Sequence, residues 1–143
     1  MQTKSLIKTR LSILLILLGV ILVAIFHSCK KYPDGPVFSI HTKTQRLSNT
    51  WKVENYKINN TDYTSLMSNY TETFSKNGAY SYIWGISSGS GVWVFQNDDR
   101  EIKLYGNNNQ SSRTLVILRL EEKSLWYYYI DGNDMHELHM LPE

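Results

Sequence analysis

Residues 112–141 have the sequence SRTLVILRLEEKSLWYYYIDGNDMHELHML, and this stretch decides the fold of the chain. It holds three short runs rich in leucine, β-branched and aromatic residues, at 112–120, 124–130 and 135–141. Polar breaks separate the runs at 121–123 and 131–134. Runs of this length, bounded by turn residues, predict antiparallel β-strands that follow one another as hairpins.

Five more runs of the same kind precede this stretch, at residues 50–58, 69–75, 79–86, 91–96 and 100–105. Strand-like runs that recur about every ten residues are typical of an antiparallel sandwich or barrel. Because most connections are short, we expect an all-β, eight-stranded, up-and-down meander. The longer link allows one helical turn over Thr61–Met67 after an Asp or Thr cap, and no other segment is predicted to be helical.

Three connections carry turn chemistry. Asn77-Gly78 and the segment Asp131-Gly132-Asn133-Asp134 are typical of tight hairpin turns whose two central residues both have positive φ. The segment Ser87-Ser88-Gly89-Ser90-Gly91 predicts a flexible break between two strands.

The N-terminus has the order of a secretory signal. Lys4, Lys8 and Arg10 precede an apolar run from Leu11 to Phe26. That run is shorter than the roughly 20 apolar residues of a membrane-crossing helix, although an uncleaved anchor is an alternative. We therefore predict a signal peptide over residues 1–28.

Cys29 is the only cysteine of the chain, which excludes an internal disulfide. The preceding Ala24-Ile25-Phe26-His27-Ser28 resembles the lipobox of bacterial lipoproteins, in which the cysteine becomes the acylated first residue of the mature chain. This resemblance implies lipidation of Cys29 and a membrane partner reached through N-terminal acyl chains. Residues 29–45, with two prolines and a glycine, are predicted to be a flexible tether, and 46–143 to be the folded domain.

The charge balance of the mature chain excludes one class of partner. Three of the 15 basic residues lie in the signal, so 12 basic residues face 13 acidic ones after residue 28. A net charge near −1 gives no basic surface for a polyanion, and we expect no nucleic-acid partner.

Four segments together resemble lipocalin-like lipoproteins. They are Leu47-Ser48-Asn49-Thr50-Trp51-Lys52-Val53, Phe74-Ser75-Lys76-Asn77-Gly78-Ala79-Tyr80, Gly91-Val92-Trp93-Val94-Phe95, and the pair Ile117-Leu118-Arg119-Leu120 with Ser124-Leu125-Trp126. The resemblance covers about residues 47–141 and implies a lipocalin-like barrel that binds a small hydrophobic ligand. Together with the lipobox it resembles Bacteroidetes-type small lipoproteins and implies the outer membrane, on its periplasmic or its surface side, since Lys30 and not an aspartate follows Cys29.

Aromatic side chains supply the candidate binding residues. An eight-stranded barrel has an interior wide enough for its own side chains or for one small ligand. We expect Trp51, Trp93 and Phe95 to pack in the core. Aromatic residues with polar tips suit a ligand-binding wall, so Tyr82, Trp84, Tyr127 and Tyr129 are predicted either to contact a ligand or to pack in the core.

No pattern in the sequence predicts catalysis, a cofactor or a metal. His136 and His139 are three residues apart in a predicted terminal edge strand, and so would point to opposite faces instead of sharing a zinc ion. Glu54, Glu72 and Glu101 are expected on solvated strand faces. We therefore expect no enzyme activity.

Two functions remain open at this point. A carrier needs a cavity of about 300 Å³ or more, lined by aromatic rings with a few convergent polar groups. A structural or partner-binding lipoprotein, which would dock an envelope protein, needs a filled barrel and an exposed apolar patch or an open strand edge.

Overall fold

The computed structural model describes residues 32–33 and 39–143. The predicted signal peptide and Cys29 lie outside the described residues. Within the described part, no helix is both long and apolar enough to span a bilayer.

Nine strands and two short helices make up the described part of the chain. The helices are α2 (Lys43–Leu47) and the 3₁₀ helix η1 (Thr64–Met67). The strands are β1 (Thr50–Ile58), β2 (Thr61–Asp62), β3 (Tyr70–Phe74), β4 (Ala79–Trp84), β5 (Ser87–Gln96), β6 (Glu101–Asn107), β7 (Arg113–Glu121), β8 (Ser124–Asp131) and β9 (Asp134–Pro142).

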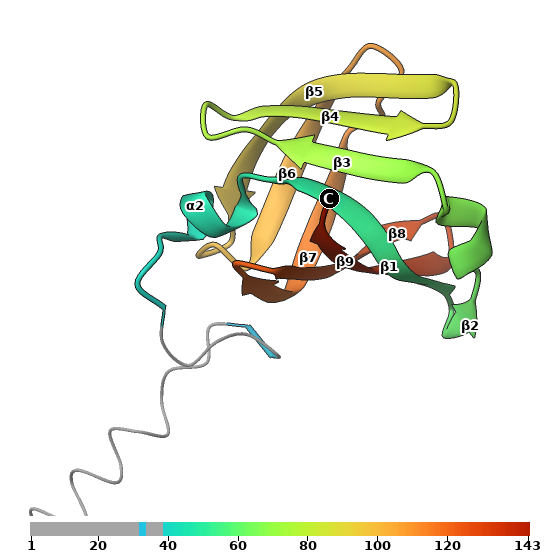
Figure 1. The fold of residues 1–143 in the computed structure, drawn as a ribbon, viewed down its shortest axis with the longest axis horizontal. Coiled ribbons are helices and arrows are strands. Elements are labelled where there is room, and N and C mark those ends of the chain that lie inside the picture. Colours follow the sequence, from blue (N-terminus) through green and yellow to red (C-terminus); the bar gives the residue numbers. More distant parts are fainter. Residues whose placement is uncertain (1–31, 34–38) are drawn as a thin grey trace, which may run out of the picture.

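All strand pairs are antiparallel, and apart from the two-residue β2 each strand pairs with the next along the chain. The pairing of β1 with β9 closes the sheet, with Trp51 opposite Pro142 and Ile58 opposite His136. The prediction of an all-β, eight-stranded, up-and-down barrel is therefore confirmed. Figure 1 shows the strands wrapped around a common interior.

The two ends of the barrel differ. Helix α2 lies across one end, and η1 with β2 stands at the other (Figure 1). At the α2 end the Trp51 indole is fully buried and donates a hydrogen bond to the Leu47 carbonyl, 2.9 Å away. Leu47 is also fully buried. We call the α2 end the closed end and the η1 end the open end.

Helix α2 was not predicted, and it begins inside the segment expected to be a tether. Its start is fixed by a capping box in which the Thr42 hydroxyl accepts from the Gln45 amide and the Gln45 side chain accepts from the Thr42 amide. Five residues are too few for a helix to be stable alone, so burial of Leu47 against the barrel holds it.

A second part of the predicted tether also contacts the barrel. Tyr32 is 2% exposed, and its hydroxyl donates to the Asp99 carbonyl at 3.1 Å. Asp99 lies in the β5–β6 connection at the closed end, where it also pairs with Lys43. Tyr32 and α2 therefore both lie at the closed end.

The predicted flexible break at 87–91 is wrong, because these residues form the first half of β5 and pair with β4. The turn is instead Gly85-Ile86, with Gly85 at φ +59°. Small residues suit this stretch, since a Cβ on Gly89 would lie 2.3 Å from the ring of Tyr82. The glycine thus lets the Tyr82 ring lie flat against β5.

The hairpin turns also differ from expectation, since each has one central residue with positive φ instead of two. Gly78 has φ +87° and Gly132 φ +61°, while their asparagine neighbours stay at negative φ. The Gly78 amide donates to the Ser75 carbonyl and the Ser75 amide to the Ala79 carbonyl. The turn between Ser75 and Ala79 is therefore a three-residue hairpin loop that ends in a left-handed glycine.

The helical turn predicted within residues 61–67 is confirmed over its last four residues as η1. The Asp62 carboxylate accepts a hydrogen bond from the Thr64 amide at 2.8 Å, at the start of the turn. Met67 is buried, and this contact seats η1 on the open end of the barrel.

The barrel interior is filled at the closed end and becomes more polar toward the open end. The bulge at 117/119 on β7 shifts the alternation so that Leu120 points inward at the closed end, and the bulge at 53/55 on β1 does the same for Tyr56 toward the open end. The predicted core residues Trp51 and Trp93 are buried, and Phe95 packs against them. Other members of this core are Phe74, Ile102, Leu104, Leu115, Ile117, Leu120, Leu125, Leu138 and Met140.

We predict that Trp51→Ala lowers the free energy of unfolding by about 3–5 kcal/mol, because it leaves a cavity under α2 and removes the bond to Leu47. The measurement is urea unfolding of the full chain in mild detergent, followed by far-ultraviolet circular dichroism. Val94→Ala, on the outer face of β5, is the control and should change stability by about 0.5 kcal/mol or less. Equal effects of the two substitutions would contradict the role of Trp51.

Candidate functional site

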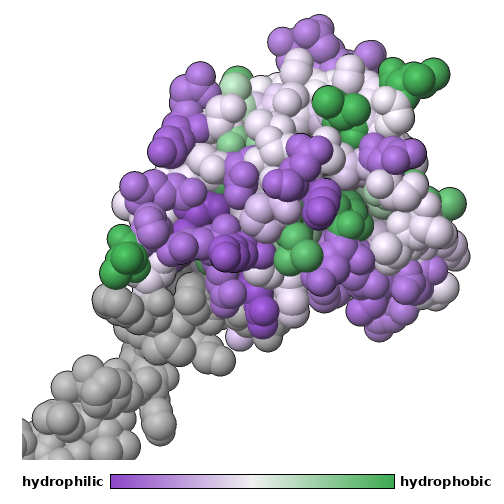
Figure 2. Space-filling view, in the orientation of Figure 1, coloured by the Kyte–Doolittle hydropathy of each residue, from purple (hydrophilic) through white to green (hydrophobic). Residues whose placement is uncertain are grey.

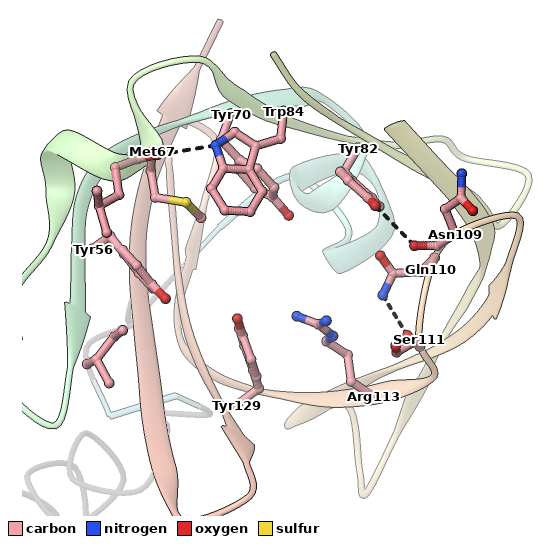
Figure 3. A pocket seen from close by; sticks show the side chains of 12 residues that line it. Tyr56, Met67, Tyr70, Tyr82, Trp84, Asn109, Gln110, Ser111, Arg113 and Tyr129 are labelled. Atoms are coloured by element: carbon pink, nitrogen blue, oxygen red, sulfur yellow. Dashed lines mark hydrogen bonds between the residues drawn. The ribbon is translucent and has the colours of Figure 1, made fainter. Parts of the chain in front are cut away.

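A cavity of about 240 Å³ occupies the open end of the barrel. Figure 3 shows its lining side chains arranged around an empty centre. They come from β1, η1, β3, β4, β7, β8 and the β6–β7 loop: Tyr56, Ile58, Leu66, Met67, Tyr70, Tyr82, Trp84, Asn109, Gln110, Ser111, Arg113 and Tyr129. Five of these are aromatic, and Arg113 alone among these lining residues carries a full charge.

The structure brings three of the four predicted binding residues to this cavity. Tyr82, Trp84 and Tyr129 line it (Figure 3). Tyr127 does not, because it lies one inward position deeper on β8 and is 1% exposed. It takes part instead in the polar layer beneath the cavity.

Tyr82 and Trp84 are held by hydrogen bonds to backbone carbonyls. The Tyr82 hydroxyl donates to the Asn109 carbonyl at 3.0 Å, and the Trp84 indole donates to the Leu66 carbonyl at 3.2 Å. These bonds join β4 to the β6–β7 loop on one side and to η1 on the other (Figure 3). The polar atoms of both rings are therefore already bonded within the protein.

The opposite wall is a stack of planar groups. The Arg113 guanidinium lies 4.4 Å from the centre of the Tyr129 ring, and the Tyr129 and His136 rings stack at 4.8 Å with 3° between their planes. The Tyr56 hydroxyl is 2.7 Å from Nδ1 of His136. Stacking on both faces fixes the orientation of Tyr129.

A buried carboxyl group lies beneath the cavity. Glu72 is 3% exposed, and its Oε1 accepts hydrogen bonds from Tyr70 and from Tyr80, the latter at 3.0 Å. Its Oε2 accepts from Tyr127 at 2.9 Å. The Tyr70 ring continues upward into the cavity lining, so this network forms a rigid polar floor.

Burial shapes the protonation of this layer. It raises the pKa of Glu72 above the ordinary value of 4.5, against the three tyrosine hydrogen bonds, which act to lower it. Burial likewise raises the pKa of Tyr70 and Tyr127 well above the usual range, and that of Tyr56 to about 12. The phenols therefore stay protonated at neutral pH and act as hydrogen-bond donors.

Glu72 corrects one expectation from the sequence, which placed it on a solvated face. It alternates with Tyr70 and Phe74 on β3, and all three point into the barrel. Arg113 was not singled out, although it alternates with the inward Leu115 and Ile117 on β7. Period-2 alternation on these strands was the signal that identifies both residues.

The two histidines of β9 point to opposite faces, as predicted. His136 stacks on Tyr129 inside, whereas His139 stacks on Trp126 outside at 4.0 Å. The strand is not an edge, because β1 and β8 flank it. Among residues 32–33 and 39–143, no group of three or more potential ligands is placed to hold a metal.

Two larger hollows, of about 440 and 450 Å³, are more open to solvent and lie outside the interior cavity. One follows the rim beside Trp84 and Ile86, and the other lies against Tyr32, Arg100 and Tyr128. Neither gathers several aromatic rings around a charged group, as the interior cavity does.

Fold and site together define a small closed antiparallel barrel with an aromatic cavity at one end. Comparison with protein-family models and with curated proteins finds no match to this chain.

We predict that Glu72 makes stability depend on pH. Because its pKa is raised in the folded state, its favourable contribution is complete below the unfolded pKa and is lost as the pH rises through the folded pKa. The unfolding free energy of the wild type, minus that of Glu72→Gln, should therefore fall as the pH rises from about 4 to about 8. Urea unfolding of both full chains at several pH values measures this difference.

Tyr127→Phe provides the comparison for this experiment. It removes one donor to the Glu72 carboxylate, so ionisation of Glu72 becomes less favourable and the loss of stability on raising the pH becomes larger. A difference between wild type and Glu72→Gln that stays constant over this pH range would refute the assignment.

Proposed function

We propose that this chain is a lipid-anchored cell-envelope protein of the lipocalin-like kind, which binds a small, largely apolar ligand in the open-end cavity and catalyses no reaction. The observation that carries the proposal is the cavity, in which five aromatic side chains surround about 240 Å³ at the end of an otherwise filled barrel. Acylation of Cys29 and placement in the outer membrane are parts of the same proposal, supported by the N-terminal sequence pattern.

The size of the cavity limits the ligand. Drug-sized ligands occupy pockets of about 300–1,000 Å³, whereas an engineered apolar cavity of about 150 Å³ binds benzene. A volume of about 240 Å³ lies between these and suits one or two rings or a short branched chain. A long acyl chain or a sterol does not fit inside.

The position of the cavity suits an anchored binding protein. Tyr32 and α2, the first described parts of the chain, lie against the closed end. The cavity lies at the other end, beside η1 and Trp84. A barrel held through its N-terminus therefore keeps its opening away from the attachment point and accessible to ligand.

The alternative function, docking of an envelope protein, has less support. A closed barrel offers no continuous strand edge for pairing. Exposed apolar side chains do occur, among them Ile83, Ile86, Val92 and Tyr105. On the face drawn in Figure 2, however, hydrophobic residues form separate small patches between hydrophilic ones. Val92 lies opposite Tyr105 on the outer face of β5 and β6, and a group of this size is an ordinary surface feature.

We predict that the full chain, reconstituted in lipid nanodiscs, binds 2-naphthamide with a dissociation constant of roughly 20 µM to 1 mM, as about 13 non-hydrogen atoms at about 0.3–0.5 kcal/mol each imply. Ser111→Phe should reduce binding at least about tenfold, because the added ring occupies the cavity. Quenching of tryptophan fluorescence, with Trp84 at the site, reports binding.

Ser81→Phe is the matched control, since Ser81 lies on the outer face of β4 between the inward Tyr80 and Tyr82. It should bind the probe as the wild type does. Equal binding by the two phenylalanine variants would place the probe elsewhere and count against the cavity as the binding site.

The anchoring part of the proposal has its own test. The wild-type chain should fractionate with membranes, and its mature mass should show acyl chains on Cys29. Cys29→Ser should lose both properties, because two or more acyl chains are what makes anchoring stable. Release of the wild-type chain into the soluble fraction would exclude the anchor without affecting the cavity.

A further inference from the structure

The cavity carries a single charged group, and that group faces the ligand space. Arg113 lies at the start of β7, and alternation with Leu115 and Ile117 directs its side chain into the barrel. Figure 3 shows the guanidinium pointing from the wall toward the centre of the cavity. An arginine side chain stays charged at all physiological pH values.

Within the described residues, Arg113 takes part in no ion pair. Glu72 lies near enough for the charge of Arg113 to act to lower its pKa, but the two groups do not pair. Glu72 is the buried acid in the layer beneath the cavity, and its two oxygens accept hydrogen bonds from the hydroxyls of Tyr70, Tyr80 and Tyr127. Asp131 shares a small rim pocket of about 110 Å³ with Arg113, but it is exposed and forms no ion pair with it.

The other polar atoms of the lining are largely used within the protein. The hydroxyl of Tyr82, the indole nitrogen of Trp84 and the hydroxyl of Tyr56 bind Asn109, Leu66 and His136 respectively. The guanidinium carbon of Arg113 lies 4.4 Å from the centre of the Tyr129 ring. A guanidinium group has five N–H donors in a fixed fork, and they can donate to a planar anion in pairs.

We propose that the ligand of this cavity is a small carboxylic acid with an aromatic or compact apolar body, whose carboxylate pairs with Arg113. This inference rests on the proposed function and names its ligand class. The body of the ligand lies between the rings of Tyr70, Tyr82 and Trp84, opposite the stacked wall. A half-buried cation that forms no ion pair gains more from an anion than from a neutral ligand.

A carboxylate fits better than a phosphate ester. One arginine matches one negative charge, whereas a phosphate monoester carries about −1.5 to −2 at neutral pH and three acceptor oxygens. The lining holds no second cation to balance that charge. The volume of about 240 Å³ also has to hold the apolar body of the ligand.

The test compares probes of equal shape and different charge. The full chain in nanodiscs of zwitterionic lipid is titrated with 2-naphthoate, 2-naphthamide and 2-naphthylmethylammonium, with tryptophan quenching as the readout. We expect the carboxylate to bind at least about tenfold more tightly than the amide, as a charge-assisted pair implies, and the ammonium to bind most weakly.

Variants of Arg113 then assign the preference. Arg113→Gln should weaken 2-naphthoate binding about tenfold or more and leave 2-naphthamide within about twofold, whereas Arg113→Lys should keep part of the preference. Arg119→Gln is the control, since Arg119 lies on the outer face of the same strand over Trp126, 3.8 Å from the ring centre. It should leave all three affinities unchanged.

The outcomes separate this inference from the function beneath it. Equal affinities of the wild type for 2-naphthoate and 2-naphthamide would overturn the carboxylate assignment and leave the binding function intact. A carboxylate preference that survives Arg113→Gln would overturn the role of Arg113. Failure of all three probes to bind would overturn the proposed function itself. The wild-type comparison decides the ligand class even where an Arg113 variant does not fold.

Discussion

Pairing of the first long strand with the last is the constraint on which the rest of this structure depends. When β9 pairs with β1, the sheet closes, and the number of strands, eight, fixes the diameter of the barrel. At that diameter, the size of the inward side chains alone decides whether a cavity remains. At the closed end Trp51 and its neighbours fill it completely. At the open end glycine, serine and the spread of the tyrosines leave the cavity.

The Glu72 layer separates these two regions. An acid bound by three phenols has no place in an apolar core unless every oxygen is satisfied, and here each oxygen is. The layer joins β3, β4 and β8 across the interior. The layer thus fixes the distance between these strands, and with it the distance between the aromatic rings that line the cavity. A packed base and a rigid polar floor let the cavity persist without a ligand to support it.

The strand pattern was enough to predict the barrel and much of its site. The choice of aromatic residues with polar tips on the predicted strands included Tyr82, Trp84 and Tyr129, and all three line the cavity. It could not tell how deep each one lies along the barrel axis, which is why Tyr127 was grouped with them. The depth of a side chain in the barrel depends on strand register, and the register here includes two bulges that the sequence does not predict. Glu72 and Arg113 were accessible to the same alternation argument, but charged residues are ordinarily assigned to solvent. Helix α2 was missed because its stability comes from burial of Leu47 and not from its own five residues.

The close approach of Gly89 to Tyr82 has a consequence for how such barrels diversify. A methyl group at position 89 would lie 2.3 Å from the Tyr82 ring. Because the Tyr82 side chain is flexible, its ring would move inward. The backbone would keep its register while the hollow above Glu72 narrowed. One substitution at position 89 would therefore change which molecules this scaffold accepts, with loss of the hydrogen bond from Tyr82 to the Asn109 carbonyl. The ligand selectivity of this barrel would then depend in part on wall residues that do not contact the ligand.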